Sequence, residues 1–596
     1  MVSKKTDGSI GTGTISERLN QSAYSYYSAT TIVPSGDRST ATGLKRFFAA
    51  ALLSSSSIMV LSSPAAAEPG VCMPGMPANG QTVNCTGMTT ASQTFTGDDL
   101  TIIADENFNQ DTSGNTIGVQ RVNAGIFITG SGGTIQHSGT IRTGEIPEGM
   151  GTYGRHNGLY IIGGTGDVSA ENTATGSITT TAVESAGIQV SATTGTSTAI
   201  NRGTILTQAR ESYGVSASNA KASVSRNYGT VITTGDQSHG VYSYTHSTGA
   251  GATSTNASGG TINVGGDLTA GVISIGGKAA TVSNASNAGI INVTGDNGAA
   301  GVAALSANGA ATAGNTGQIR LQSDVADGVM LGGYNQDIGV FASSNGTATA
   351  TNGLGATITD SGQGSSIGVY ATGRTVDPFE DRGMMYGMLL RPPGGYGNAY
   401  ATNDGTITLT GRSSAGLVAV APGATSTATN NGSITVTGDY SNGIVTTGDT
   451  TNVVNTGTVS VTGSGSYGVR ASSRSIATTN VTNSGTITQS GAAGMTRYGA
   501  AGVFVSGPTV NVTNTSTGTI TGTDTALRIA YAGTVTIVND GTMNGDVTAI
   551  SRKGPPMYGM TVPSFSLTNS GTINGQVVPA GGVAARITNN GGTIGD

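Results

Sequence analysis

The five residues Asn201-Arg202-Gly203-Thr204-Ile205 form the sequence phrase that decides the fold. The same phrase, Asn-x-Gly-x followed by Ile, Val or Met, returns ten more times, beginning at Asn227, Asn287, Asn315, Asn403, Asn430, Asn455, Asn483, Asn539, Asn569 and Asn590. A repeat at a nearly constant period indicates that one structural unit stacks on the next.

A second mark, Gly before an aliphatic residue, comes nine residues after the Ile position in many units, as from Ile205 to Gly214. It occurs at Gly187, Gly214, Gly240, Gly271, Gly301, Gly328, Gly368, Gly416, Gly443 and Gly468. A third mark is a short alternating run that ends in Asn, such as residues 511–514. Each unit therefore holds three runs with the two-residue period of a strand, separated by turn-forming residues.

Three strands in each unit, stacked unit on unit, predict an all-β protein. The expected fold is a parallel β-helix with about three short strands per coil. We expect it to be right-handed, because β-crossover-β connections nearly always take that hand. The recurring Asn has two interpretations. Its amide forms an inward ladder from coil to coil, or Asn merely tolerates the turn conformation.

Composition favours one solenoid over several globular domains. Gly accounts for 97 of 596 residues, only 10% are charged, and Trp is absent, so bulky core residues are few. Disorder is the alternative for a chain so rich in small polar residues. The formal net charge is −6. Without a basic stripe interleaved with aromatic residues, we expect no nucleic-acid partner, and no cofactor is predicted.

Residues 1–67 are predicted to be an extended signal peptide. A basic pair at Lys45-Arg46 precedes a short apolar run, and small residues follow up to Ala67. Cleavage is expected between Ala67 and Glu68. Export to an oxidising compartment favours a disulfide between Cys72 and Cys85, with two free thiols as the alternative.

The predicted domains are a cap region with the cysteine loop at residues 68–135 and β-helix repeats at residues 136–596. Loop insertions are expected near 144–157, 375–398 and 552–564. These insertions gather Met, Tyr, Arg and Pro, which the coils avoid. Either they lie along the rod and cover it, or they bind a partner, since loops on a rigid scaffold often carry function. The loop-binding candidates are Tyr386, Arg391, Tyr396 and Tyr558.

The signal peptide, cysteine loop and Asn-x-Gly-Thr-Ile repeats together resemble the passenger region of Gram-negative autotransporters (type V secretion). The resemblance covers nearly the whole chain after Ala67. It implies a β-helix that is displayed on the cell surface or released, often as an adhesin. The implied partners are a protein or glycan on a host or neighbouring cell, and an outer-membrane β-barrel translocator.

The end of the sequence departs from that family. Residues 569–575 and 590–594 are still repeats, and the stretch lacks the ten-residue alternating strands and aromatic girdles of a membrane barrel. We therefore expect a fragment, a split gene, or a passenger whose translocator is encoded elsewhere.

The predicted function is an adhesin-like or structural binding module without catalysis. The alternative is a carbohydrate-active enzyme, a polysaccharide lyase or hydrolase, because β-helices also host such enzymes; fold alone does not confer that activity. Asp360-Ser361-Gly362 faintly resembles a serine-protease motif, but it falls in an ordinary turn. The four histidines suggest no site, and His239 occupies a variable corner position.

One pattern suggests a metal. Gly-Asp recurs at the same corner of three successive units, which would stack Asp236, Asp267 and Asp296 in a row. A hard cation such as Ca²⁺ would relieve the repulsion between these carboxylates. The alternative is that Asp simply suits a solvated turn after Gly.

Overall fold

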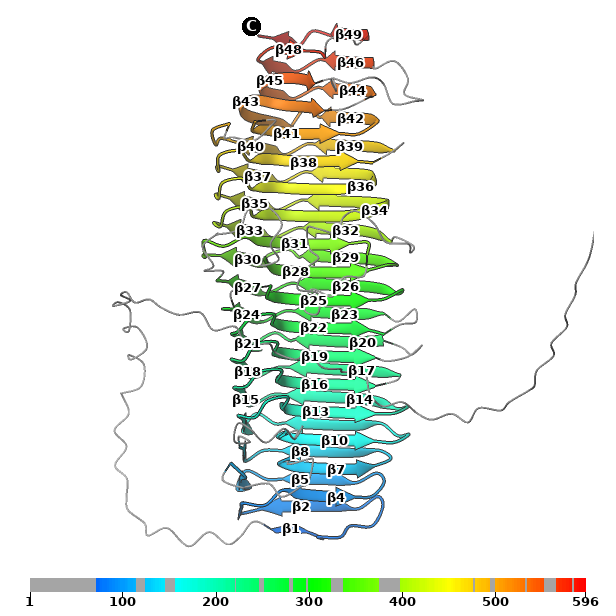
Figure 1. Ribbon diagram of the computed structural model, residues 1–596, viewed down its shortest axis with the longest axis vertical. Coiled ribbons are helices and arrows are strands. Elements are labelled where there is room, and N and C mark those ends of the chain that lie inside the picture. Colours follow the sequence, from blue (N-terminus) through cyan, green and yellow to red (C-terminus); the bar gives the residue numbers. More distant parts are fainter. Residues whose placement is uncertain are drawn as a thin grey trace, which may run out of the picture. The chain divides into compact units, whose positions relative to one another are not determined.

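The computed structural model describes residues 71–113, 124–144, 156–219, 221–245, 251–277, 282–295, 298–322, 336–374, 397–474, 477–493, 499–530, 533–550, 564–580 and 584–595. The chain divides into residues 1–65 and 66–596, and all the described residues belong to the second part. They form strands and turns without any helix. Figure 1 shows the strands stacked as successive coils of one column.

Strand pairing confirms a parallel β-helix with three strands in most coils. Each strand pairs in parallel with the equivalent strand of the next coil, as β10 (Leu159–Gly163) does with β13 (Ala186–Ala192). The only antiparallel pair among the described strands is β1 (Val71–Met73) with β2 (Thr82–Thr86). The pairings define three sheets, which we name after their marker residues.

The glycine sheet contains the strands that carry the Gly-aliphatic mark. It consists of β4 (Gln93–Thr96), β7 (Ile126–Gly130), β10, β13, β16 (Tyr213–Asn219), β19 (His239–Thr245), β22 (Ala270–Gly276), β25 (Ala300–Ser306), β28 (Asp337–Ser344), β31 (Ser366–Thr372), the first halves of β34 (Ala415–Asn430) and β36 (Asn442–Asn455), β38 (Tyr467–Ser473), β41 (Ala501–Ser506), the second halves of β43 (Thr519–Ala530) and β45 (Thr542–Ile550), and β48 (Val577–Val578).

The asparagine sheet contains the next strand of each coil. It consists of β2, β5 (Thr101–Ala104), β8 (Gly133–His137), β11 (Val168–Asn172), β14 (Thr196–Asn201), β17 (Ala222–Asn227), β20 (Gly251–Asn256), β23 (Ser283–Asn287), β26 (Ala310–Asn315), β29 (Thr347–Asn352), β32 (Asn398–Asn403), the second halves of β34 and β36, β39 (Thr478–Asn483), β42 (Thr509–Asn514), β44 (Thr534–Asn539), β46 (Ser564–Asn569) and β49 (Ala584–Asn589).

The threonine sheet completes each coil. It consists of β3 (Met88–Thr89), β6 (Asn109–Asp111), β9 (Thr140–Thr143), β12 (Ser177–Thr180), β15 (Thr204–Thr207), β18 (Thr230–Thr233), β21 (Thr261–Val264), β24 (Ile290–Val293), β27 (Gln318–Leu321), β30 (Thr357–Asp360), β33 (Thr406–Leu409), β35 (Ser433–Val436), β37 (Thr458–Val461), β40 (Thr486–Gln489), the first halves of β43 and β45, β47 (Thr572–Asn574) and β50 (Thr593–Ile594). Because β34, β36, β43 and β45 each run through a corner, the three sheets are continuous.

The interior is one narrow apolar core that runs the length of the coils. Along β14, buried Ser197, Ala199 and Asn201 alternate with half-buried residues, as a two-residue period requires. Ile, Val, Ala and Leu from all three sheets fill the centre. Each coil packs on its neighbours, so small side chains suffice.

An asparagine ladder recurs from coil to coil at the corner where the asparagine sheet turns into the threonine sheet. This confirms the interpretation of the recurring Asn as an inward ladder. Each side-chain amide donates from Nδ2 to Oδ1 of the equivalent Asn one coil later, at 2.7–2.9 Å. The second amide proton reaches a corner carbonyl, as from Asn201 to Gly203 at 3.1 Å. The ladder comprises Asn172, Asn201, Asn227, Asn256, Asn287, Asn315, Asn352, Asn403, Asn430, Asn455, Asn483, Asn514, Asn539, Asn569 and Asn589.

The ladder corrects the sequence reading at its end and extends it elsewhere. The last rung is Asn589, and not the predicted Asn590, because β49 pairs Asn569 with Asn589. Four further rungs have a turn two residues longer than the phrase allows: Asn172, Asn256, Asn352 and Asn514. The two extra residues lengthen the turn after the Asn, while the Asn itself stays paired with the Asn of the neighbouring coil.

The Gly-aliphatic mark exists because the glycine meets the isoleucine of the first mark. A Cβ atom on Gly240 would lie 2.5 Å from Cγ2 of Ile262 and 2.6 Å from the carbonyl oxygen of Gly271. The same contact recurs in coil after coil. In one coil the pairing assigns the mark to another glycine than the predicted Gly328: β25 pairs Val302 with Val340, which places Gly339 opposite Gly301. Gly328 itself lies outside the described residues.

The central strands of the glycine sheet are buried on both faces. All residues of β25 and of β28 are buried. Outward-facing Ile273, Ala303 and Phe341 belong to a second apolar cluster, separate from the interior. Strands buried on both sides read as continuous apolar runs. The outward residues of the other two sheets are instead half-buried or exposed.

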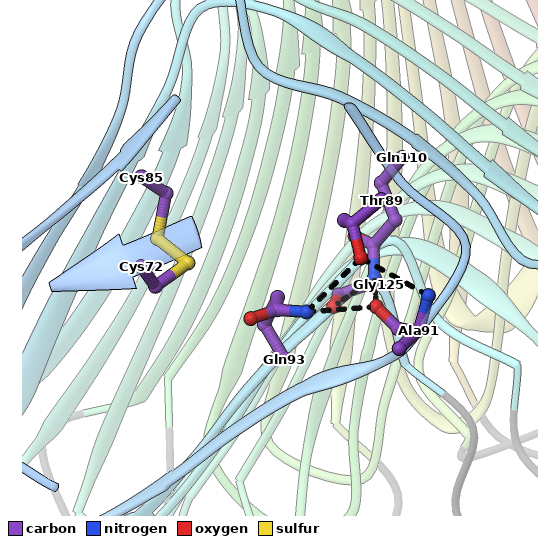
Figure 2. Close-up of a disulfide and its surroundings, with 7 residues drawn as sticks. All are labelled: Cys72, Cys85, Thr89, Ala91, Gln93, Gln110 and Gly125. Carbon is purple, nitrogen blue, oxygen red and sulfur yellow. Dashed lines mark hydrogen bonds between the residues drawn. A yellow bond between two sulfur atoms is a disulfide. The ribbon is translucent and has the colours of Figure 1, made fainter. Parts of the chain in front are cut away.

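The predicted disulfide between Cys72 and Cys85 is present and links the antiparallel pair at the start of the described chain. The two residues lie opposite each other in β1 and β2, with Cα atoms 4.1 Å apart. Figure 2 shows the bond beside a corner at which Gln110 donates to the carbonyls of Ala91 and Gly125, at 2.7 and 2.8 Å. Parallel pairing starts at β2 with β5, so the region predicted as a cap already forms coils.

We predict that the inward ladder stabilises the fold far more than an outward ladder of the same chemistry. Asn480 and Asn483 both lie in β39 and both bridge three coils, but Asn480 faces outward and Asn483 is buried. Asn483→Ala removes the acceptor of one Asn455 N–H and the donor to Asn514 Oδ1, which should cost about 2–6 kcal/mol at roughly 1–3 kcal/mol for each unsatisfied group. Asn480→Ala should cost under about 1 kcal/mol. Urea unfolding of both variants measures the difference, and equal losses would contradict it.

A second prediction concerns the glycine mark. Gly240→Ala should destabilise the protein by about 1–3 kcal/mol, because its methyl group overlaps the neighbouring coil. Gly314→Ala in β26 is the matched control, since a Cβ there meets nothing within 4 Å. Thermal unfolding should show a lower midpoint for the first variant only. A tolerated Gly240→Ala would refute the packing argument.

Candidate functional site

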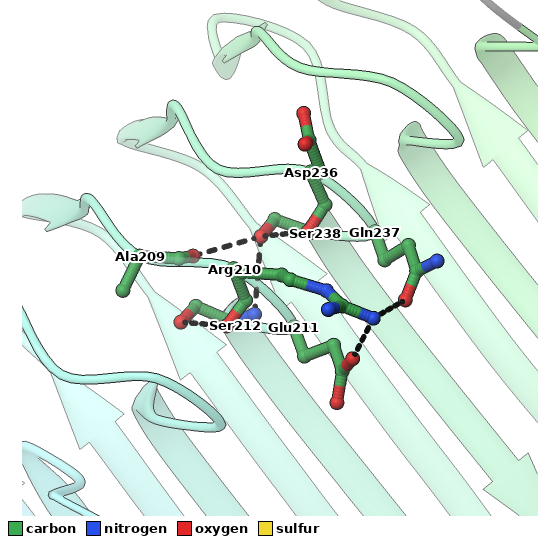
Figure 3. A network of polar contacts seen from close by, with 7 residues as sticks. All are labelled: Ala209, Arg210, Glu211, Ser212, Asp236, Gln237 and Ser238. Carbon is green, nitrogen blue, oxygen red and sulfur yellow. Dashed lines mark hydrogen bonds and ion pairs between the residues drawn. The ribbon is translucent and has the colours of Figure 1, made fainter. Parts of the chain in front are cut away.

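Two of the predicted metal residues, Asp236 and Asp267, lie at the corner where the threonine sheet turns into the glycine sheet. Figure 3 shows this corner in two successive coils, with Arg210, Glu211 and Ser212 beside Asp236, Gln237 and Ser238. Glu211 and Gln237 have positive φ values of 57° and 55°. In this conformation the N–H of Glu211 donates to the carbonyl of Asp236 at 2.9 Å.

A turn residue in the left-handed conformation recurs in several coils. Among the residues that the structure describes, the non-glycine residues with positive φ are Asp99, Glu184, Glu211, Gln237, Leu268, Ser413 and Tyr440. The N–H of Gln237 donates to Asp267 O at 2.7 Å, and that of Tyr440 to Ser464 O at 2.8 Å. Strain of about 1–3 kcal/mol per residue persists only where surrounding structure holds it. Pairing between coils supplies that support.

The corner carboxylates are also used to join coils. Asp236 Oδ1 accepts the backbone N–H of Asp267 at 2.9 Å. At the same corner, Asp439 makes this contact with Ser464 and Asp546 with Gln576, at 2.7 and 3.0 Å. At the corner between the glycine and asparagine sheets, Asp98 makes it with Ser131 and Asp167 with Thr196, at 2.7 and 2.6 Å. This gives the recurring Gly-Asp a structural role that the sequence pattern did not reveal.

The Ca²⁺ hypothesis remains a prediction. Asp296 lies outside the described residues, so the row of three carboxylates is seen only at Asp236 and Asp267. Within the described ranges, no group of three or more His, Cys, Asp or Glu side chains is placed to hold a metal ion. One oxygen of Asp236 is already engaged by a backbone donor.

Arg210 forms the charged contacts of this corner. Its Nη2 atom lies 2.7 Å from Glu211 Oε1 and donates to Gln237 Oε1 at 3.2 Å. The side chains of Arg210 and Glu211 are 58% and 36% exposed. An ion pair this open to solvent contributes little to stability. The corner therefore offers a polar, solvated surface.

The other candidate residues fall elsewhere. Tyr386, Arg391, Tyr396 and Tyr558 lie outside the described residues, and so do the cleavage residues Ala67 and Glu68. The described strands show where the predicted insertions leave the coils: between β9 and β10, between β31 and β32, and between β45 and β46. Each insertion is therefore anchored at both ends by a paired strand.

Asp360 is a structural residue of the interior. Its side chain is 2% exposed, and its carboxylate accepts the N–H of Gly362 at 2.8 Å and the hydroxyl of Ser366. Ser361 is exposed on the outer surface. The two residues of the protease-like motif thus face opposite sides of the coil.

Sequence reasoning missed His137, which stands in the asparagine column. The run His137-Ser138-Gly139-Thr140-Ile141 is the repeat phrase with His in place of Asn, and that spacing is the signal that identifies it. His137 Nδ1 lies 2.9 Å from Asn172 Oδ1. Because Nδ2 of Asn172 already donates to Asn201, Oδ1 is the acceptor and Nδ1 carries the proton.

Burial lowers the pKa of His137 to about 4, against a smaller opposing effect of the hydrogen bond to Asn172. Burial also lowers the pKa of His239 to about 4, and that of His156 below its ordinary value. His239 Nδ1 accepts the N–H of Ala270 at 3.0 Å, so the neutral ring joins two coils.

No protein-family model, curated protein or solved structure matches this chain. In the part of the chain that the structure describes, no helix has the length and apolar character that crossing a membrane requires. The function therefore has to be argued from the fold and from its surface residues.

We predict a loss of stability in weak acid that depends on His137. The folded pKa of about 4 lies below the ordinary value of 6.5, so the unfolded chain binds the proton first as the pH falls. Stability is complete above pH 6.5 and declines between pH 6.5 and 4, by up to about 3 kcal/mol for this residue. His137→Asn should keep the ladder and reduce the decline. Urea unfolding at pH 7.5 and 4.5 tests this, and an unchanged pH dependence would contradict it.

Proposed function

We propose that the chain is the passenger region of a Gram-negative autotransporter and serves as an adhesin-like or structural surface module. The single observation that supports this most is the uninterrupted asparagine ladder from Asn172 to Asn589. It makes the described chain a continuous, regularly paired β-helix. Such a scaffold holds loops and flat faces at fixed positions without the need for a deep pocket.

The disulfide supports export. Structural disulfides form in oxidising compartments and are rare in the bacterial cytosol. Cys72 and Cys85 lie shortly after the proposed cleavage point between Ala67 and Glu68. An exported β-helix exposed outside the cell gains from a covalent bond at the coil where pairing begins, since end strands fray most readily.

The proposed contact sites are the insertions, of which the longest lies between β31 and β32. Its sequence gathers Tyr386, Arg391 and Tyr396, residue types that are enriched at binding interfaces. The partner is a protein or glycan on a host or neighbouring cell. An outer-membrane β-barrel translocator would deliver the chain. The proposal includes no catalysis.

Surface display tests this function. The full chain, fused ahead of an autotransporter barrel, should be displayed on a Gram-negative host, and its exposure confirmed with external protease. Cells that carry the chain should attach to one another or to a host-cell monolayer more than cells that carry the barrel alone. Alanine at Tyr386, Arg391 and Tyr396 should reduce attachment, because these side chains supply the contact area.

Tyr558→Ala tests the candidate in the insertion between β45 and β46 separately, and Tyr228→Ala, an exposed tyrosine outside the insertions, is the matched control. Attachment that survives the triple replacement would exclude the longest insertion as the contact site. Displayed chain without any gain in attachment would overturn the adhesin proposal. Release of reducing ends from a panel of polysaccharides would instead favour the enzyme alternative.

A further inference from the structure

The outer surface of the threonine sheet carries a regular array of hydroxyl groups over six successive coils, from β30 to β43. Three outward positions in each coil, separated by inward residues, are occupied only by Thr or Ser. We call this array the threonine lattice. Its members are Thr357, Thr359, Ser361, Thr406, Thr408, Thr410, Ser433, Thr435, Thr437, Thr458, Ser460, Thr462, Thr486, Thr488, Ser490, Thr519, Thr521 and Thr523.

The lattice is in register from coil to coil. Strand pairing places Thr406 opposite Ser433, and Thr408 opposite Thr435. The same alignment holds for every pair of neighbouring strands from β30 to β43. The third column continues the backbone pairing at Thr437, Thr462 and Ser490, whose N–H groups donate to the carbonyls of Leu409, Val436 and Val461 at 3.0, 3.1 and 3.0 Å. All its members are half-buried or exposed.

The lattice has clear boundaries and a uniform chemistry. The coil before it presents Gln318 and Arg320 outward, and the coil after it presents Thr542 and Asn544. Among its eighteen positions there is no charged, aromatic or amide side chain. Other outward surfaces are mixed: the outer face of the glycine sheet gathers apolar residues, and the asparagine sheet includes Tyr400 and Asn480.

The spacing of the lattice is fixed by the backbone. Coils lie roughly 4.8 Å apart, and alternate residues of a strand roughly 6.7 Å apart, so the hydroxyls form a rectangular grid. Thr has a restricted χ1 angle because it is branched at Cβ. On the inward face of the same strands, buried Ile, Val and Leu side chains pack in the interior core and fix the position of the backbone. These side chains would therefore lose little conformational entropy when a rigid ligand binds.

A neutral grid of this kind fits an ordered water lattice. A Thr or Ser hydroxyl can donate one hydrogen bond and accept two, so it matches a lattice water in either proton orientation. In the third column, Thr410 and Thr523 already donate to the carbonyls of Gly362 and Gly491, at 2.9 and 3.0 Å, and keep only their capacity to accept. Carboxylates and ammonium groups can only accept or only donate. Oxygen atoms on a prism face of ice form a rectangular grid of comparable dimensions, and the Thr methyl groups fill the spaces between them. We propose that the threonine lattice binds the surface of ice crystals.

The composition argues against a glycan as the ligand of this surface. Sugar rings are commonly held by aromatic side chains that stack on their apolar faces, and the lattice has none. The proposal does not depend on the adhesin function, because it rests on residues other than those of the insertions.

The test uses the full chain and growing ice. Purified protein should be enriched in a slowly grown ice fraction and should hold the freezing point below the melting point. Thr435→Tyr places a bulky ring in the centre of the lattice and should abolish both effects. Thr427→Tyr is the matched control: it lies in β34 on the asparagine sheet beside Tyr400, where a ring is already accommodated.

Circular dichroism and the unfolding midpoint should match the wild type for both variants, so that a loss of ice binding is not a loss of folding. The proposal is overturned if the wild type is excluded from ice, or if Thr435→Tyr retains activity. Binding to insoluble cellulose or chitin that Thr435→Tyr removes, without any ice activity, would assign the lattice to a glycan. A dimer in sedimentation that Thr435→Tyr disrupts, again without ice activity, would assign it to a second copy of the chain.

Discussion

The fold depends on one constraint: from Asn172 onward, every coil must bring a side-chain amide to the same inner corner. A buried amide without partners destabilises a protein by several kcal/mol, since each unsatisfied group costs roughly 1–3 kcal/mol. Asn172 donates to Asn201, and the amide of Asn201 finds its own acceptor only if the next coil supplies Asn227 at the same corner. The ladder therefore sets the register, and register decides which side chains face inward.

The same constraint explains what is free to vary. Between Asn201 and Ile205 the corner spans four residue steps, whereas between Asn172 and Ile178 it spans six. The amide and the buried isoleucine keep their places in both cases. Between β31 and β32 a much longer insertion is accommodated, and β29 still pairs with β32 in full register. Variation is confined to the corners because pairing within the sheets leaves no room for it.

This division also explains how far the sequence could predict the structure. The three-strand coil, the ladder and the cysteine bond were predictable, because each rests on a local pattern or on the chemistry of one residue type. Gly328 was predicted from the nine-residue spacing after Ile319, whereas the strand that pairs with β25 carries Gly339, and a local spacing rule cannot reveal which strands pair. His137 was missed as a ladder member because a search for Asn ignores a residue with an equivalent donor. The role of the corner carboxylates was not predictable, as a stacked Asp suits a cation and a backbone N–H equally well until the geometry is known.

The rigidity of the interior has a consequence for the exterior. In a globular domain the position of a surface hydroxyl depends on local packing. In this fold the backbone pairing between coils fixes the spacing of every outward residue. The glycine sheet uses this order to bury a second apolar layer around Phe341, and the threonine sheet uses it to present hydroxyls in rows. A β-helix can thus recognise an extended, repetitive surface through many weak contacts at fixed intervals. Such recognition needs neither a pocket nor a perturbed pKa, and its signature is periodicity in the outward residues.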